Sequence, residues 1–169
     1  MKRLSSLIPM LIVAAAFVGC ARSVTSYVFS PPTFNQQAWT LAYPKERDTQ
    51  PVKCILTNDQ TGAVITVMLD PSSAPTARYS TMSMQDRMRS AGYNVGALVR
   101  YEDSRGEYAG FVFSYGHERG KVVAVRRPNV DKTFLLLGVW DESNDVIASI
   151  DIDRLAREFD VTAYEVPPG

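Results

Sequence analysis

Runs of apolar residues, many of them alternating with polar ones, predict a series of β-strands. We expect strands over 38–44, 52–58, 63–69, 95–102, 108–115, 121–126 and 133–140. Their β-branched and aromatic residues are typical of strands, and most of the short breaks between them contain Gly or Pro. Such short connections favour antiparallel pairing, because parallel strands need a long crossover.

The segment 76–91 has the best helical pattern of the chain. Apolar side chains recur near helical spacing at Tyr79, Met82, Met84, Met88 and Ala91. Gly92 follows as a candidate C-cap. We expect this helix to pack its methionines against the sheet.

The last element fits two structures. Ser143 can cap a helix whose apolar face includes Val146, Ile150 and Phe159. The run 146–152 also fits a strand, which would leave a helix only over 153–159. We favour a structure that is mostly helix.

The first twenty residues have the pattern of a bacterial lipoprotein signal. Lys2 and Arg3 precede an apolar stretch that is too short for a good membrane span. The end of this stretch, Phe17-Val18-Gly19-Cys20, resembles a lipobox, in which the cysteine receives diacylglycerol and becomes the new N-terminus. The alternative is an ordinary signal peptide whose apolar region contains a cysteine.

These patterns divide the chain into four parts. We expect a signal peptide over 1–19, a lipidated N-terminus and flexible tether over 20–33, a globular domain over 34–160 and a tail over 161–169. The lipid on Cys20 would hold the protein to a membrane on the periplasmic side of the cell envelope. In the lipoproteins that it resembles, an Asp after the cysteine commonly retains the protein at the inner membrane, so Ala21 at this position favours the outer one.

Composition excludes several classes of function. The 18 basic and 18 acidic residues leave no net charge, which gives no support to nucleic-acid binding. Two cysteines and one histidine are too few for a disulfide framework or a Cys/His zinc site. The sequence therefore predicts no metal or other cofactor.

Candidate catalytic residues are isolated. Cys54 lies in an apolar strand and is expected to be buried. His117 lies in a turn without an identifiable nucleophile, and Asp151 and Asp153 offer too few oxygen ligands for calcium. We expect no catalytic site.

One group of basic residues is a candidate contact for a partner or for lipid head groups. It surrounds a single predicted hairpin and consists of Arg119, Lys121, Arg126, Arg127 and Lys132. A projecting hairpin could bring these charges to an anionic surface. The alternative is a solvated surface with ordinary ion pairs.

The order of elements resembles the Mog1/PsbP-like superfamily, including bacterial DcrB-type lipoproteins. The resemblance covers 34–152 and depends on an aromatic strand ending in Pro44, the hairpin ending in 64–67, and the helix that follows. It continues with Tyr108-Ala109-Gly110-Phe111, the apolar strand 134–139 and the closing Val146-Ile147-Ala148-Ser149-Ile150. It implies an α+β fold, an antiparallel β-sheet flanked by helices in an α/β/α sandwich.

Members of this superfamily mostly bind protein partners, so the resemblance implies a non-catalytic binding or assembly subunit with an envelope protein partner. The alternative is a small-ligand or metal-binding periplasmic lipoprotein, suggested by the aromatic residues. A deep apolar cavity would favour this alternative, and a filled core would count against it.

Overall fold

The computed structural model describes residues 24–30, 39–45, 51–70, 76–128 and 130–166. The predicted signal peptide, Cys20 and the start of the predicted domain at Phe34 lie outside these residues. Within them, strands form an eight-stranded sheet and a separate two-stranded sheet, and every pairing is antiparallel.

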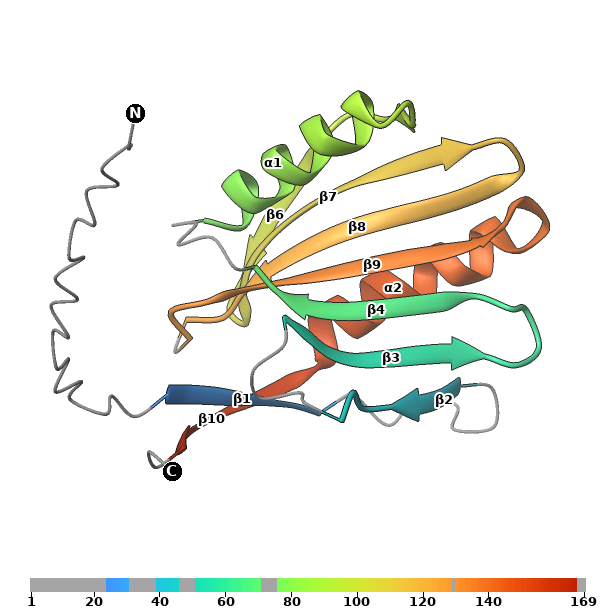
Figure 1. Ribbon diagram of the computed structural model, residues 1–169. Coiled ribbons are helices and arrows are strands. Elements are labelled where there is room, and N and C mark those ends of the chain that lie inside the picture. Colours follow the sequence, from blue (N-terminus) through green and yellow to red (C-terminus); the bar gives the residue numbers. More distant parts are fainter. Residues whose placement is uncertain (1–23, 31–38, 46–50, 71–75, 129, 167–169) are drawn as a thin grey trace, which may run out of the picture.

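The elements follow one another along the chain as shown in Figure 1. They are β1 (Val24–Ser30), β2 (Trp39–Ala42), β3 (Val52–Asn58), β4 (Val64–Leu69), α1 (Ala77–Ser90), β5 (Asn94–Val95), β6 (Val99–Asp103), β7 (Gly106–Tyr115), β8 (Glu118–Arg126), β9 (Thr133–Asp141), the short 3₁₀ helix η1 (Glu142–Asn144), α2 (Asp145–Glu158) and β10 (Asp160–Val166).

The large sheet has the strand order β2-β3-β4-β9-β8-β7-β5, and β6 also pairs with β7. α1 packs on one face of this sheet, mainly over β7 and β8, and α2 packs on the other face, over β8 and β9 (Figure 1). This is the predicted α+β arrangement, an antiparallel sheet flanked by helices. The hairpin β3–β4 and the run β7–β8–β9 were both predicted from the sequence.

Alternation along the strands divides the core into two clusters. On β8, Val123 and Val125 face α2, whereas Val122 and Ala124 face α1. The larger cluster also contains Trp140, Phe159 and other side chains from α2 and from β3, β4, β7 and β9. Both faces of the central strands are therefore filled by apolar side chains.

Two predicted boundaries are corrected. Val24–Ser30 was assigned to the flexible tether and 161–166 to the tail, but these residues pair with each other as strands β1 and β10. Both stretches contain β-branched and aromatic residues, which favour strands. The sequence prediction instead followed the Ser, Thr and Pro content around β1, which is typical of a flexible tether.

The packing prediction for α1 is only partly confirmed. Met88 is buried and Met84 is half-buried against the core, but the side chains of Tyr79 and Met82 are 57% and 43% exposed. The buried face instead uses Ala77 and small or polar residues. Thr81 Oγ1 donates to the carbonyl oxygen of Ala109, 3.1 Å away on β7. The Thr81 hydroxyl thus has acceptors on both α1 and β7, whereas the buried Ser80 Oγ has no hydrogen-bond partner among the described residues.

Two other local predictions change. The predicted strand 95–102 is interrupted, and β5 and β6 pair separately with β7. The last element is a helix, as favoured, but Ser143 does not cap it. Ser143 lies in η1, where its backbone N–H donates to Asp141 Oδ1 at 2.9 Å, and Asn144 is the N-cap residue of α2.

Candidate functional site

The five basic residues predicted as a contact site do not form one patch. Arg119 and Arg126 lie at opposite ends of β8, seven residue steps or about 23 Å apart. Arg126 points to the face of the sheet that carries α1, whereas its neighbour Arg127 points to the face that carries α2. Lys132 is half-buried in the loop between β8 and β9.

Two members of the group form ion pairs within the domain. Arg119 Nη2 lies 2.7 Å from Glu142 Oε1, and Lys121 Nζ lies 2.6 Å from Asp153 Oδ2 on α2. Arg126 also has an interaction partner. These charges thus stabilise the domain internally, and the hairpin is not the free basic surface that the sequence suggested.

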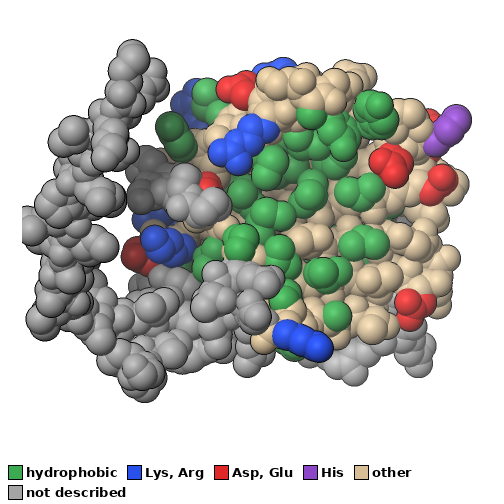
Figure 2. Space-filling model, in the orientation of Figure 1, with side chains coloured by type: hydrophobic (Ala, Val, Ile, Leu, Met, Phe, Trp, Pro, Cys, Tyr) green, Lys and Arg blue, Asp and Glu red, His purple; other side chains and the backbone are tan. Residues whose placement is uncertain are grey.

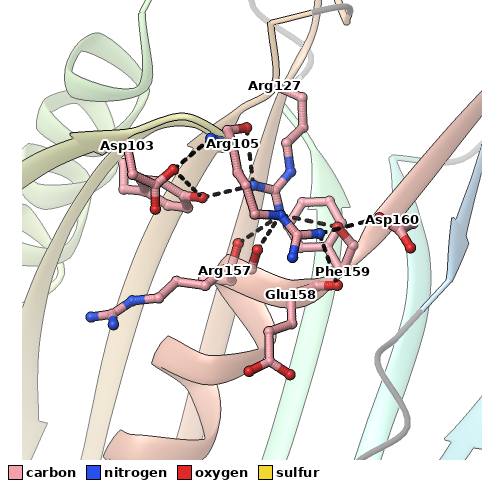
Figure 3. A network of polar contacts seen from close by, with 9 residues as sticks. Asp103, Arg105, Arg127, Arg157, Glu158, Phe159 and Asp160 are labelled. Carbon is pink, nitrogen blue, oxygen red and sulfur yellow. Dashed lines mark hydrogen bonds and ion pairs between the residues drawn. The ribbon is translucent and has the colours of Figure 1, made fainter.

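Arg127 has the most extensive role of the five. Its guanidinium points to the C-terminal end of α2 (Figure 3), and the residue is only 9% exposed. Nη2 donates to the carbonyl oxygens of Ala156, Arg157 and Phe159, each 3.0 Å away. A helix end leaves such carbonyls without partners, and a cation there also complements the helix dipole.

The opposite side of the Arg127 guanidinium contacts the start of β7. Nη1 donates to Tyr108 Oη at 2.7 Å, and Tyr108 Oη in turn donates to Asp103 Oδ1 at 3.2 Å. Burial is the largest cause of the raised pKa of Tyr108, and the charge of Arg127 works against it. The network joins the turn between β6 and β7 to the end of α2.

A cleft of about 570 Å³ lies next to this network, where β6, β7 and β8 meet. Its lining is mostly charged, with Glu102, Asp103, Glu107, Arg126, Arg127 and Asp131. Several of these groups already have structural roles. Asp103 Oδ1 accepts the N–H groups of Arg105 and Gly106, and the Glu107 carboxylate accepts the first N–H groups of α1. The cleft is therefore a polar edge of the fold and not a deep apolar cavity.

The remaining candidates stay apart. Cys54 is fully buried, and burial raises the pKa of its thiol to about 12, which makes it a poor nucleophile. His117 is exposed in the turn between β7 and β8. Asp151 accepts a hydrogen bond from Trp39 Nε1 at 3.2 Å, and Asp153 pairs with Lys121. In the described ranges, no three His, Cys, Asp or Glu residues are grouped as a metal site would need.

An apolar surface is the feature that the sequence did not reveal. It lies on the face of the sheet that carries α1, over β4, β3 and the part of β9 that α1 leaves uncovered, and no described helix lies in front of β4 and β3 in Figure 1. Figure 2 shows hydrophobic side chains gathered in the middle of this face. Its half-buried members are Ile55, Val64, Met68, Leu137 and Val139 on the strands and Met84 on the adjoining α1, and we call this set the apolar sheet face.

A groove of about 160 Å³ borders the apolar sheet face, along α1. Met68 and Leu135 contribute from the sheet, and Ser80, Ser83, Met84 and Arg87 contribute from α1. Strand alternation places these two sheet residues on the same side of the sheet. Alternation does not determine that Leu135 is buried while Met68 stays half-buried, because that depends on where the helix crosses the sheet.

The architecture is that of a PsbP-like α+β domain. No family model matches the sequence, and no curated protein does. Solved structures do match. Cyanobacterial PsbP (CyanoP) from Synechocystis sp. PCC 6803 has a TM-score of 0.55 at 14% identity, over 89% of this chain and 99% of that one.

LpqN, involved in cell envelope biogenesis of Mycobacterium tuberculosis, has a TM-score of 0.54 at 11% identity, over 81% of this chain and 84% of that one. At such identities the likeness shows a shared fold. No described helix is long and apolar enough to cross a membrane.

Proposed function

We propose that this protein is a lipid-anchored bacterial envelope protein of the DcrB type, whose domain is a non-catalytic binding or assembly subunit on the periplasmic side. The observation that carries the binding role is the apolar sheet face. A half-buried apolar surface on an otherwise filled domain is typical of a site for another molecule. The partner would be an envelope protein.

The anchor is supported by the sequence before the domain. The lipobox-like run from Phe17 to Cys20 supplies a cysteine for lipid, and Ala21 favours the outer membrane. Stable attachment needs more than one acyl chain, which a mature lipoprotein carries. LpqN, which shares the fold, is involved in cell envelope biogenesis in its own organism, and this agrees with an envelope location.

The alternative role, binding of a small ligand or a metal, has less support. Its natural site would be the charged cleft at the ends of β6, β7 and β8. There Asp103, Glu107 and Arg127 already satisfy backbone groups of the turn and the two helices. The two apolar clusters fill the core on both sides of the sheet. We therefore prefer a surface-binding role to a cavity-binding one.

The anchor is tested by labelling cells with radioactive palmitate and separating their membranes on a density gradient. We expect the wild-type chain to carry the palmitate label and to be found in the outer-membrane fraction. Cys20→Ser should lose the label and the membrane association, whereas Cys54→Ala, the matched control, should keep both. A Cys20→Ser chain that is still labelled and still membrane-bound would overturn the anchor.

A further inference from the structure

We propose that the apolar sheet face binds an amphipathic α-helix of an envelope protein, with a carboxylate of that helix paired to Arg87. This rests on the proposed binding role and names the surface and the chemistry of the partner. Three observations carry it: the side chains of the face, its width next to α1, and the charge at its rim.

Neighbouring strands place the apolar side chains of the face in register. Val64 is opposite Val139, and Thr66 lies between Ile55 and Leu137 in adjacent strands. Side chains directly opposite one another on antiparallel strands lie on the same face. They form a mostly apolar area with Thr66 in its middle, and Figure 2 shows hydrophobic side chains gathered beside α1.

The shape of the face fits a helix better than a strand. β3, β4 and β9 each pair with strands on both sides, so an extended peptide finds no free backbone groups there. The two strand spacings from β9 to β3 amount to about 10 Å. Packed helices also lie 8–10 Å apart, so a second helix beside α1 would cover this part of the sheet.

Arg87 gives the partner a charge. It is exposed on α1 at the rim of the groove, and it makes no side-chain ion pair or hydrogen bond with the described residues. Asp70, the other charged residue of the groove lining, is buried and has an interaction partner of its own. Arg89, in the same turn of α1, differs because it pairs with Asp86 at 3.3 Å. An unpaired cation beside an apolar area favours a helix with apolar residues at i, i+3, i+4 and i+7 and an acidic residue at the edge of that stripe.

The first test is site-specific photocrosslinking of the full chain in native membranes. In the test variant, a benzoylphenylalanine replaces Val64 on the apolar sheet face. In the matched control, it replaces Ile150, which is 60% exposed on α2 at the opposite face. Mass spectrometry then maps the crosslinked peptide. We expect adducts at Val64 only, on an amphipathic segment that carries an acidic residue.

The second test uses that segment as a synthetic peptide, with its affinity for the full chain measured by fluorescence anisotropy at low salt. We expect Arg87→Glu to weaken binding about fivefold and Val64→Asp to weaken it more than about tenfold. Arg89→Glu should change binding less than about twofold. Replacing the acidic residue of the peptide by lysine should restore binding to Arg87→Glu. Because Arg87 is exposed, its variant tests the proposal even where Val64→Asp does not fold.

Several results would overturn the proposal. They are adducts at Val64 with lipid or with a second copy of this chain, equal adducts at both positions, no adduct at Val64, or binding that Arg87→Glu leaves unchanged. These results would not affect the proposed lipid anchor, because palmitate labelling tests the anchor independently. An adduct confined to Ile150 would keep a binding subunit but move its site to the other face.

Discussion

The guanidinium carbon of Arg127 lies 4.4 Å from the ring centre of Phe159, whose carbonyl oxygen also accepts a hydrogen bond from Arg127. One side chain thus contacts both the ring and the backbone of the residue that ends α2. A desolvated arginine over an aromatic ring adds cation–π attraction to its hydrogen bonds. Phe159 packs in turn on Phe134, so the contact fixes the end of α2 to the core.

Arg127→Ala is expected to lower the free energy of unfolding by about 3 kcal/mol or more. Truncation leaves three carbonyl oxygens at the end of α2 and Tyr108 Oη without their donor in a buried place. Urea unfolding followed by circular dichroism measures the change. Arg127→Lys should recover only part of it, because an ammonium lacks the planar fork. Arg89→Ala, in an exposed pair, is the control, and a comparable loss there would contradict this account.

Much of the fold could be predicted because the signals are local. The hairpin β3–β4 combines β-branched strands with a turn at Gly62, where φ is +68°. α1 ends at Ser90 with Ala91 as its C-cap, and Gly92, which the sequence suggested as the C-cap, follows one residue later with φ of +89°. The partner of β1 could not be predicted, because it lies at the far end of the chain and pairing over such a distance leaves no local pattern.

The basic group shows why the site was harder to predict. Sequence proximity suggested one patch, but strand alternation sends Arg126 and Arg127 to opposite faces. The ion pair of Lys121 depends on where α2 crosses β8, which one sequence does not specify. The apolar sheet face could not be predicted for a similar reason, because apolar strand residues have the same sequence pattern whether or not a helix covers them.

The Lys121–Asp153 pair should be worth more than an exposed pair. Its side chains are 18% and 33% exposed, against 51% and 74% for Arg89–Asp86. Partial burial reduces solvent screening, so we expect a coupling energy of about 1–2 kcal/mol for the first pair and at most about 0.5 kcal/mol for the second. Double-mutant cycles in urea measure both. Equal coupling energies would show that burial adds nothing here.

Cys54 should make stability fall in alkaline solution. Its thiol has a pKa of about 12 in the folded chain, against an ordinary value of 9.0. The folded chain keeps this proton where the unfolded chain loses it, so the stabilisation is complete below pH 9 and is lost as the pH rises towards 12. Titration of this residue lowers the free energy of unfolding by at most about 1.4 kcal/mol per pH unit.

We compare the free energy of unfolding of the Cys20→Ser chain with that of the Cys20→Ser/Cys54→Ala chain at each pH. The difference between the two isolates the titration of Cys54 from those of tyrosine and lysine. Urea unfolding from pH 8 to 11 provides the measurement. The same Cys20→Ser chain should react with a thiol reagent at pH 8 only after unfolding. Rapid labelling of the folded chain would contradict the burial of this thiol.

Glu107 should control the order of the first turn of α1, and hence the wall of the groove. Its carboxylate oxygens lie 3.3 Å and 3.4 Å from the N–H nitrogens of Ala77 and Arg78, and Thr76 Oγ1 accepts the N–H of Tyr79 at 3.1 Å. An anion at a helix N-terminus satisfies free N–H groups and complements the dipole. We expect Glu107→Ala to cost about 1 kcal/mol and Glu107→Gln less, because glutamine keeps an acceptor without the charge. Hydrogen exchange of the first-turn amides should rise in the same order, while α2 stays unchanged. If both variants speed exchange equally in both helices, Glu107 acts on global stability and not as a cap of α1.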